Sequence, residues 1–176
     1  MLAQGLSATS ACDRACDNPK VERRVFHLLL VEDNPADVGL FKHACKECNI
    51  RGRLHVAADG STAMRFLRKE KEFNGAPTPD VLVLDLNLPM IGGHEILQMV
   101  KADPELRSIP VIILTSSDCR REIHQAYAEG AACFITKPTD VDQYFAAVKA
   151  SERFWLRTAT LPVTSRSHRA ASAGSN

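Results

Sequence analysis

Short hydrophobic runs alternate with longer amphipathic segments from residue 25 to residue 157. The runs hold four to six residues and are rich in branched side chains, which is typical of strands buried on both faces of a sheet. The amphipathic segments repeat apolar residues three and four positions apart, which is typical of helices. The pattern predicts strands near residues 26–31, 53–58, 81–85, 111–115 and 133–136. It predicts helices near residues 35–49, 61–70, 93–101, 120–129 and 141–156.

Residues at the ends of these segments suit helix starts and stops. Asn34-Pro35 supplies an N-cap and a proline at the first helical position. Asp59 and Asp140 suit the starts of the second and fifth helices, and Gly130 suits the end of the fourth. Strands that alternate with helices predict an α/β fold, with a doubly wound, five-stranded parallel sheet and helices on both faces. Pattern alone leaves the strand order open.

Composition narrows the class of protein. The chain has 176 residues, of which 45% are hydrophobic and 24% charged, which suits one soluble globular domain. Residues 25–163 hold 16 basic and 18 acidic side chains, so we expect no nucleic-acid partner. No hydrophobic run is long enough for a membrane span, and no secretory signal is visible. We therefore expect a cytoplasmic protein.

The two ends of the chain differ from its middle in composition and in hydrophobic pattern. Residues 1–24 show no sustained period and are predicted to form a flexible leader. Residues 25–157 are predicted to form the domain and 158–176 a C-terminal extension, disordered from about residue 164, where serine, alanine and glycine dominate. Cys45 and Cys48 form a C-x-x-C pattern, but they fall on the apolar stripe of the first helix. We therefore interpret them as core residues rather than as a redox or zinc site.

Candidate chemistry collects where the strands end. Glu32-Asp33 follows the first strand, Asp85 ends the third, Thr115 ends the fourth and Lys137 follows the fifth. The carboxyl ends of parallel strands share one edge of the sheet, which is where ligands bind in α/β folds. Crowded carboxylates need a cation, and Mg²⁺ suits a few carboxylates that keep water and accept phosphate oxygens. The set therefore predicts phosphoryl transfer to an aspartate.

Taken together, these residues resemble the receiver domain of bacterial response regulators over residues 25–155. The resemblance depends on Glu32-Asp33, on Asp85 followed by Asn87 and Leu88-Pro89-Met90, on Gly92-Gly93, on Thr115 and on Lys137-Pro138. The intervals of 30 residues from Asp85 to Thr115 and of 22 residues from Thr115 to Lys137 match the usual spacing of the family. The resemblance implies a flavodoxin-like fold with strand order 2-1-3-4-5.

The resemblance also assigns roles. Asp85 would accept a phosphoryl group from a phosphohistidine of a sensor histidine kinase. Asp33, Asp85 and the main-chain carbonyl of Asn87 would bind Mg²⁺, or Mn²⁺ in its place, and Glu32 would act through water. Lys137 would contact the phosphoryl group.

The resemblance predicts a conformational switch as well. Thr115 would turn towards the phosphoryl group, and Phe134 would change rotamer with it. Phe134 has the bulk of the tyrosine found in other members but lacks its hydroxyl. The peptide bond between Lys137 and Pro138 is expected to be cis.

A narrower resemblance is to single-domain regulators that work with bacterial phytochromes. It depends on the Asp85-Leu-Asn-Leu-Pro stretch, on Leu114-Thr-Ser-Ser, on the loop 71–79 and on the apolar C-terminal end. It implies a homodimer, with an interface that contains Phe154, Trp155, Leu156 and Leu161. The alternative is that Phe154 and Trp155 only complete the core side of the fifth helix.

Two other functions fit the sequence less well than the regulator. An aspartyl-phosphate phosphatase or hydrolase would use a second aspartate two residues after the nucleophile, but Asn87 stands there. A DNA-binding regulator would need a further domain, and about twenty residues after Trp155 are too few for a helix-turn-helix. The sequence therefore favours a phospho-acceptor regulator that is not an enzyme in its own right.

Overall fold

The computed structural model describes residues 25–47 and 52–162. The strands are β1 Phe26–Val31, β2 Gly52–Ala57, β3 Val81–Leu84, β4 Val111–Thr115 and β5 Cys133–Thr136. The helices are α1 Pro35–Glu47, α2 Gly60–Arg68, α3 Gly93–Ala102, α4 Arg120–Ala128 and α5 Val141–Glu152. A 3₁₀ turn, η1 Lys71–Phe73, and a π-helical end, η2 Arg153–Thr158, complete the set. Every predicted strand and helix is present, although the fifth helix was expected to run as one α-helix to residue 156.

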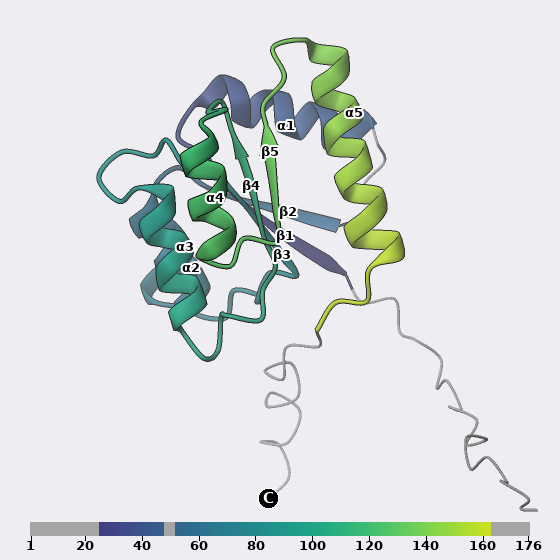
Figure 1. The fold of residues 1–176 in the computed structure, drawn as a ribbon. Coiled ribbons are helices and arrows are strands. Elements are labelled where there is room, and N and C mark those ends of the chain that lie inside the picture. Colours follow the sequence, from purple (N-terminus) through teal and green to yellow (C-terminus); the bar gives the residue numbers. More distant parts are fainter. Residues whose placement is uncertain (1–24, 48–51, 163–176) are drawn as a thin grey trace, which may run out of the picture.

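All five strands are parallel and lie in the order β2-β1-β3-β4-β5, which confirms the order that the resemblance implied (Figure 1). The chain moves from β1 to β2 in one direction and then from β3 to β5 in the other. The carboxyl ends of β1 and β3 therefore meet where the direction changes, which is the usual place for a binding site in such a sheet.

Two hydrophobic layers cover the sheet, α2, α3 and α4 on one face and α1 and α5 on the other (Figure 1). β3 shows why the strand runs are hydrophobic throughout. Leu82 and Leu84 belong to the layer under α2, α3 and α4, whereas Val81 and Val83 belong to the layer under α1 and α5. A strand that is covered on both faces has no solvent side for polar residues.

The predicted helix starts are confirmed by side-chain hydrogen bonds. The carboxylate of Asp59 accepts from the amide of Thr62 at 2.7 Å, and that of Asp140 accepts from the amide of Gln143 at 2.9 Å. Asn34 Oδ1 accepts from the amide of Ala36 at 2.9 Å. These bonds satisfy amides that have no partner within the helix and fix where each loop ends.

The predicted leader, residues 1–24, and the extension from residue 163 lie outside the described residues, as does Cys48. Cys45 packs against the layer under α1 and α5, as expected for a core position. Within the described part of the chain, none of the helices has the length and hydrophobicity that crossing a membrane requires.

Candidate functional site

The backbone of the sheet continues beyond the strands and positions the candidate residues. The amide of Glu32 donates to the carbonyl of Ala57 at 3.0 Å, and that of Asp85 donates to the carbonyl of Val31 at 3.1 Å. The amide of Lys137 donates to the carbonyl of Thr115 at 2.6 Å. The polar residues therefore follow directly from hydrogen-bonded strands, which is why they are held at one edge.

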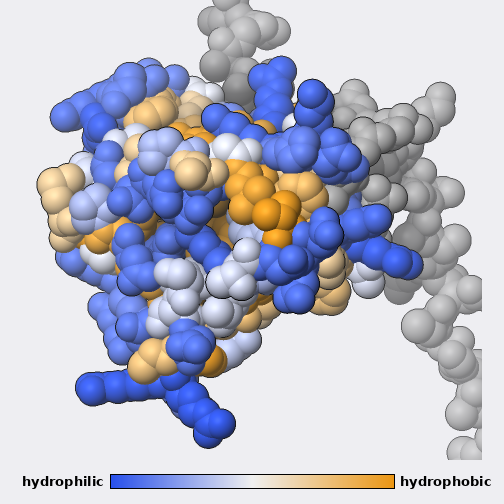
Figure 2. Space-filling model, turned by 90° about the horizontal axis from the view of Figure 1, so that it is seen from above, coloured by the Kyte–Doolittle hydropathy of each residue, from blue (hydrophilic) through white to orange (hydrophobic). Residues whose placement is uncertain are grey.

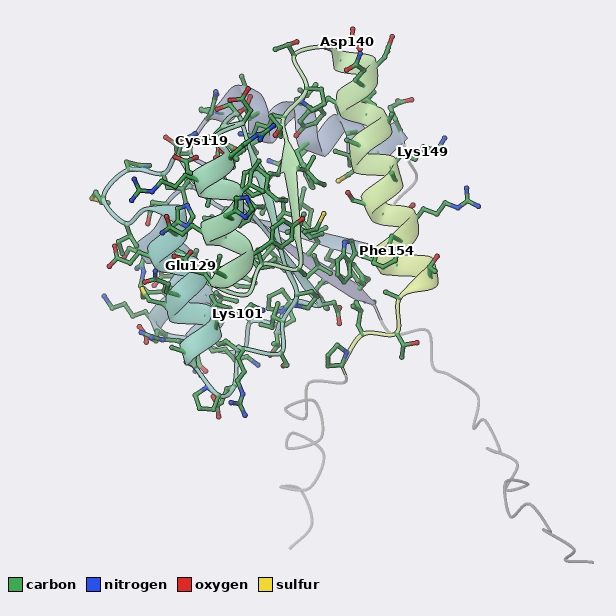
Figure 3. The ribbon with its side chains drawn as sticks, in the orientation of Figure 1. Lys101, Cys119, Glu129, Asp140, Lys149 and Phe154 are labelled. Carbon is green, nitrogen blue, oxygen red and sulfur yellow. The ribbon has the colours of Figure 1, made fainter. Side chains whose placement is uncertain are left out.

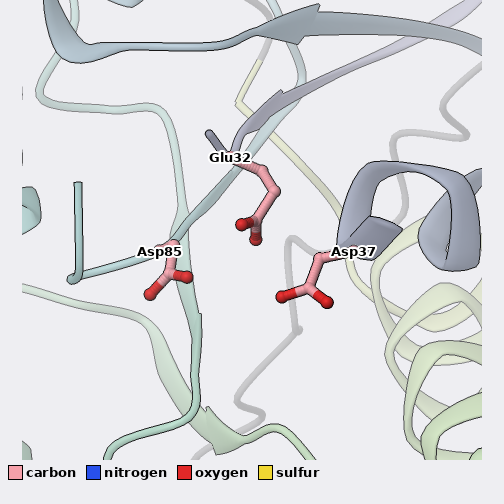
Figure 4. Close-up of side chains that lie close together, drawn as sticks. All are labelled: Glu32, Asp37 and Asp85. Atoms are coloured by element: carbon pink, nitrogen blue, oxygen red, sulfur yellow. The ribbon is translucent and has the colours of Figure 1, made fainter. Parts of the chain in front are cut away.

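Lys137 lies at the centre of this edge. Its Nζ is 2.7 Å from Glu32 Oε2, 2.8 Å from Asp37 Oδ2 and 2.7 Å from Asp85 Oδ2. The side chains of Lys137, Glu32 and Asp85 are 10%, 3% and 6% exposed. The carboxylates of Glu32, Asp37 and Asp85 point towards one another from β1, α1 and β3 (Figure 4). We call these four residues the acidic pocket.

Burial and charge oppose each other in the acidic pocket. Burial acts to lower the pKa of Lys137, but the hydrogen bonds that Lys137 donates to three carboxylates outweigh it and raise that pKa well above its ordinary value. Burial raises the pKa of Glu32, and the bond from Lys137 offsets this in part. Lys137 therefore stays protonated, and its single positive charge faces three carboxyl groups.

Asp37 is the member that the sequence analysis missed. It lies in the first turn of α1, and the turn brings its carboxylate back over the end of β1. An acid in the first turn of the helix after the acidic pair lies near the same edge of the sheet, but whether it reaches Lys137 depends on the direction in which α1 leaves the sheet. Asp33, which was expected to bind the metal directly, is exposed, and Lys137 Nζ bonds Glu32, Asp37 and Asp85 instead.

Thr115 and Asn87 are joined on the other side of Asp85. The amide of Asn87 donates to Asp85 Oδ1 at 3.0 Å, and Asn87 Nδ2 donates to Thr115 Oγ1 at 3.2 Å. Thr115 is fully buried, and its hydroxyl also accepts from the amide of Ser117 at 3.5 Å. The hydroxyl of Thr115 is thus engaged with the loop after β4 in this arrangement.

Phe134 is half-buried and packs against the layer under α2, α3 and α4. Its amide donates to the hydroxyl of Tyr127 at 3.2 Å, and Tyr127 belongs to α4. The hydroxyl that Phe134 lacks is therefore present nearby, on the neighbouring helix.

Gly93 allows the loop after β3 to fold back on the acceptor. A Cβ at this position would lie 2.3 Å from the carbonyl oxygen of Asp85 and 2.5 Å from the Cα of Leu86. Both are backbone atoms, so neither can move aside cheaply. The glycine is required by close approach rather than by an unusual backbone angle.

The expectation for Pro138 is wrong. The described residues contain no cis peptide bond, so the bond between Lys137 and Pro138 is trans. The preference for trans before proline is only about 0.5–1 kcal/mol, and the surrounding structure therefore decides the isomer. With the trans bond, the Lys137 amide still reaches Thr115 and its ammonium still reaches all three acids.

The four predicted interface residues have different surroundings. Phe154 is 52% exposed, whereas Trp155 and Leu161 pack against the layer under α1 and α5. Trp155 and Leu156 also line an apolar hollow between α5 and the sheet. Of the four, Phe154 presents the largest apolar surface to a partner.

The donor set of the acidic pocket fits a hard divalent cation. One oxygen from each of Glu32, Asp37 and Asp85 lies within 4.8 Å of the others, and Mg²⁺ or Mn²⁺ prefers such oxygens. The carboxyl edge of the sheet is seen from above in Figure 2, where hydrophilic side chains cover most of the surface. A hydrophobic patch lies among them, so this face is largely but not wholly hydrophilic.

Comparisons with known proteins agree with this geometry. The chain is similar to the response regulator Rcp1 of Synechocystis sp., with 38% identity over 135 residues, which are 77% of this chain and 92% of Rcp1. The structure of the phosphorylated cyanobacterial phytochrome response regulator RcpA has 41% identity and a TM-score of 0.76, covering 80% of this chain and 100% of that one. The Mn²⁺-bound form of Rcp1 has 38% identity and a TM-score of 0.75, covering 78% and 99%. The response regulator receiver domain matches residues 28–149, and the chain therefore belongs to the response-regulator receiver family.

Proposed function

We propose that the protein is a response regulator in which Asp85 accepts a phosphoryl group from the phosphohistidine of a sensor histidine kinase. The observation that carries this proposal is the buried contact of Asp85 Oδ2 with Lys137 Nζ at 2.7 Å, at the carboxyl edge of the sheet. In the transfer, an Asp85 oxygen forms a bond to phosphorus as the bond from phosphorus to the histidine nitrogen breaks. The imidazole leaves with the electron pair and takes up a proton from water.

The residues of the pocket have separate tasks in this reaction. Lys137 is fixed as a cation and would pair with a phosphoryl oxygen. Asp85, Asp33 and the carbonyl of Asn87 would hold Mg²⁺ with Glu32 acting through water, and Asp37 is an added candidate because its carboxylate lies in the cluster. The bound ion would supply positive charge for the phosphoryl oxygens.

Labelling with acetyl phosphate and Mg²⁺ tests the proposal. One phosphoryl group per chain should be added, it should be lost in alkali as an acyl phosphate is, and peptide mapping should locate it at Asp85. Chelation of the metal should prevent labelling. A label on another residue, or no label on the folded protein, would contradict the assignment.

Phosphorylation would act through the loop after β4. We infer that Thr115 leaves its bond with Asn87 to bond a phosphoryl oxygen, and that Phe134 moves inward with it. This would repack the surface of α4 and β5 and shift a two-state equilibrium. The protein would then signal by contact with other proteins rather than by turnover of a substrate. Steady release of phosphate from a generic ester would favour a hydrolase instead.

We further propose that the kinase is a phytochrome-type photoreceptor in the cytoplasm. Support comes from RcpA, which is described as a cyanobacterial phytochrome response regulator, and from the bacteriophytochrome response regulator AtBRR, which has 37% identity and a TM-score of 0.63. Phosphoryl transfer from a purified bacteriophytochrome that changes with red and far-red light would test the pairing.

A homodimer through the C-terminal end of α5 and η2 is the second part of the proposal. An exposed aromatic residue on a small domain often marks an interface, and Phe154 is 52% exposed. The Phe154→Asp variant should weaken self-association by about tenfold or more, because a charge would be buried at the contact. Sedimentation over a range of concentrations measures this. Val141→Asp, at the other end of α5, is the control; equal behaviour of both variants and the wild type would contradict the interface.

A further inference from the structure

Four polar side chains join α3 to the end of α4, and we call them the Glu129 cluster. His94 Nδ1 lies 2.7 Å from Glu129 Oε2. Gln98 Nε2 donates to Glu129 Oε1 at 2.7 Å, and Gln125 Nε2 donates to the same oxygen at 2.8 Å. His94 and Gln98 belong to α3, and Gln125 belongs to α4. Glu129 caps the end of α4 (Figure 3). One carboxylate therefore receives side chains from two helices.

Two members of the Glu129 cluster, Glu129 and His94, are partly sheltered from solvent, whereas Gln98 and Gln125 are exposed. The side chains of Glu129 and His94 are 12% and 23% exposed. Burial acts to raise the pKa of Glu129, but the hydrogen bonds from His94, Gln125 and Gln98 outweigh it, so the carboxyl stays charged. Among the described residues, His94 Nε2 is buried without a hydrogen-bond partner. His94 therefore makes its polar contact through Nδ1, the ring nitrogen that faces Glu129.

Little apolar burial holds α4 in place. Ala126 is the one buried residue of α4, whereas α3 buries Gly93, Ile96, Leu97 and Val100. Apolar burial stabilises roughly in proportion to area, so α4 gains little from it. A charge-assisted cluster at the end of such a helix carries a larger share of its attachment than it would on α3.

The Glu129 cluster also lies between the two parts of the proposed switch. His94 directly follows Gly93, whose amide donates to the carbonyl of Leu86 and where a Cβ would lie 2.3 Å from the carbonyl oxygen of Asp85. α4 follows the loop after β4, in which Thr115 is bonded to Asn87 and Ser117. The cluster thus connects the loop of the phospho-acceptor to the helix that the switch would move.

We propose that Glu129 and His94 are positioning residues that hold α4 in the arrangement seen here and so oppose the phosphorylated arrangement. This rests on the proposed function, because it takes Asp85 as the acceptor and α4 as the element that moves. A contact that is made in the resting arrangement and lost in the phosphorylated one lowers the fraction of molecules that can bind the phosphoryl group or its mimic. The apparent affinity for that ligand falls in proportion to this fraction.

Binding of beryllofluoride with Mg²⁺, a mimic of the phosphoryl group, tests the proposal by calorimetry. Glu129→Ala should bind beryllofluoride about five-fold more tightly than the wild type, at the low end of the range for coupling between sites. Its thermal stability should fall at the same time. A merely structural role would lower stability without tightening the ligand. Glu95→Ala, an exposed acid on the same helix as His94, is the control and should leave both quantities unchanged.

The outcomes separate this proposal from the proposed function. No binding of beryllofluoride by the folded wild type would refute the function itself. Binding by the wild type, with equal or weaker binding by Glu129→Ala, would overturn the positioning role. If Glu129→Ala does not fold, Glu129→Gln keeps an oxygen for the glutamines while removing the charge that faces His94. It should tighten binding in the same direction by a smaller factor, and His94→Ala should add little once Glu129 is changed.

Discussion

The Asp85→Asn variant is expected to lose all labelling by acetyl phosphate and yet to unfold at a higher temperature than the wild type. The loss of labelling follows from chemistry, because an amide is too weak a nucleophile to form an acyl phosphate. Asparagine keeps an oxygen that can accept from the amide of Asn87, a bond of 3.0 Å in the wild type. The loop after β3 should therefore keep its shape, and the effect on labelling is chemical rather than structural.

The gain in stability follows from the balance of charges around Asp85. Its Oδ2 lies 2.7 Å from Lys137 Nζ, while one oxygen each of Glu32 and Asp37 lies within 4.8 Å of its own. Coulomb energy falls with distance, so at that range the repulsion of Asp85 by Glu32 and Asp37 together is at least as large as its attraction to Lys137. Burial then determines whether Asp85→Asn is more stable than the wild type. Burying a carboxylate costs more free energy than burying an amide, and Asp85 is 5% exposed.

We expect the free energy of unfolding of Asp85→Asn to rise by about 1 kcal/mol, the lower end for replacing a buried charge that is poorly compensated. Thermal and denaturant unfolding followed by circular dichroism measure it. Asp33→Asn removes the same charge from an exposed carboxylate and should change the free energy by less than about 0.5 kcal/mol. A less stable Asp85→Asn, or one that labels like the wild type, would contradict the account.

The fold could be predicted from the sequence because the strands are buried on both faces. The run from Val81 to Leu84 is hydrophobic at every position, and the structure buries all four residues. The order of the strands could not be predicted from the hydrophobic pattern. It depends on pairing between residues far apart in the chain, such as Leu28 with Val81, and no local pattern encodes that. The order came from the resemblance to a family.

The acidic pocket could be predicted in part. Glu32, Asp85 and Lys137 were expected together because each follows a strand, and the structure brings them together. Asp37 was missed because its position depends on the direction in which α1 leaves the sheet. For the same reason, the sequence could not tell which of Asp33 and Asp37 would lie towards Lys137.

Two further differences come from small energies. The isomer at Pro138 depends on about 0.5–1 kcal/mol, which a single residue pair cannot settle. The change from α-helix to π-helix after Glu152 involves only the short segment Arg153–Thr158, and the period of so few apolar residues does not reveal it. In both cases the packing of neighbouring residues decides the conformation.

Changing Lys137 to methionine is expected to slow labelling by about a hundredfold, as the loss of one group that stabilises a transition-state charge does. The same change should tighten the binding of Mg²⁺ by roughly tenfold, which corresponds to about 1.4 kcal/mol. The two effects have opposite signs because the ammonium has two roles. It would stabilise the phosphoryl group, but it lies within 2.8 Å of three carboxylates that would otherwise face a cation.

Removing the ammonium should also destabilise the metal-free protein. Glu32 and Asp85 are 3% and 5% exposed, so their charges would lose their partner without gaining water. Breaking a buried ion pair in this way costs about 3–5 kcal/mol, and Mg²⁺ should restore most of the loss. Unfolding with and without Mg²⁺ would show a larger stabilisation by the metal in Lys137→Met than in the wild type.

Lys101→Met is the matched control for this prediction. Lys101 is also half-buried, and its Nζ donates to the carbonyls of Arg107 and Ile109 at 3.1 and 2.7 Å, without a carboxylate among these partners. Its replacement should lower stability but leave Mg²⁺ binding and labelling unchanged. If Lys137→Met binds Mg²⁺ no more tightly than the wild type in calorimetry, the carboxylates that Lys137 holds are not the ones that receive the metal. The ligands would then have to be sought among exposed acids such as Asp33.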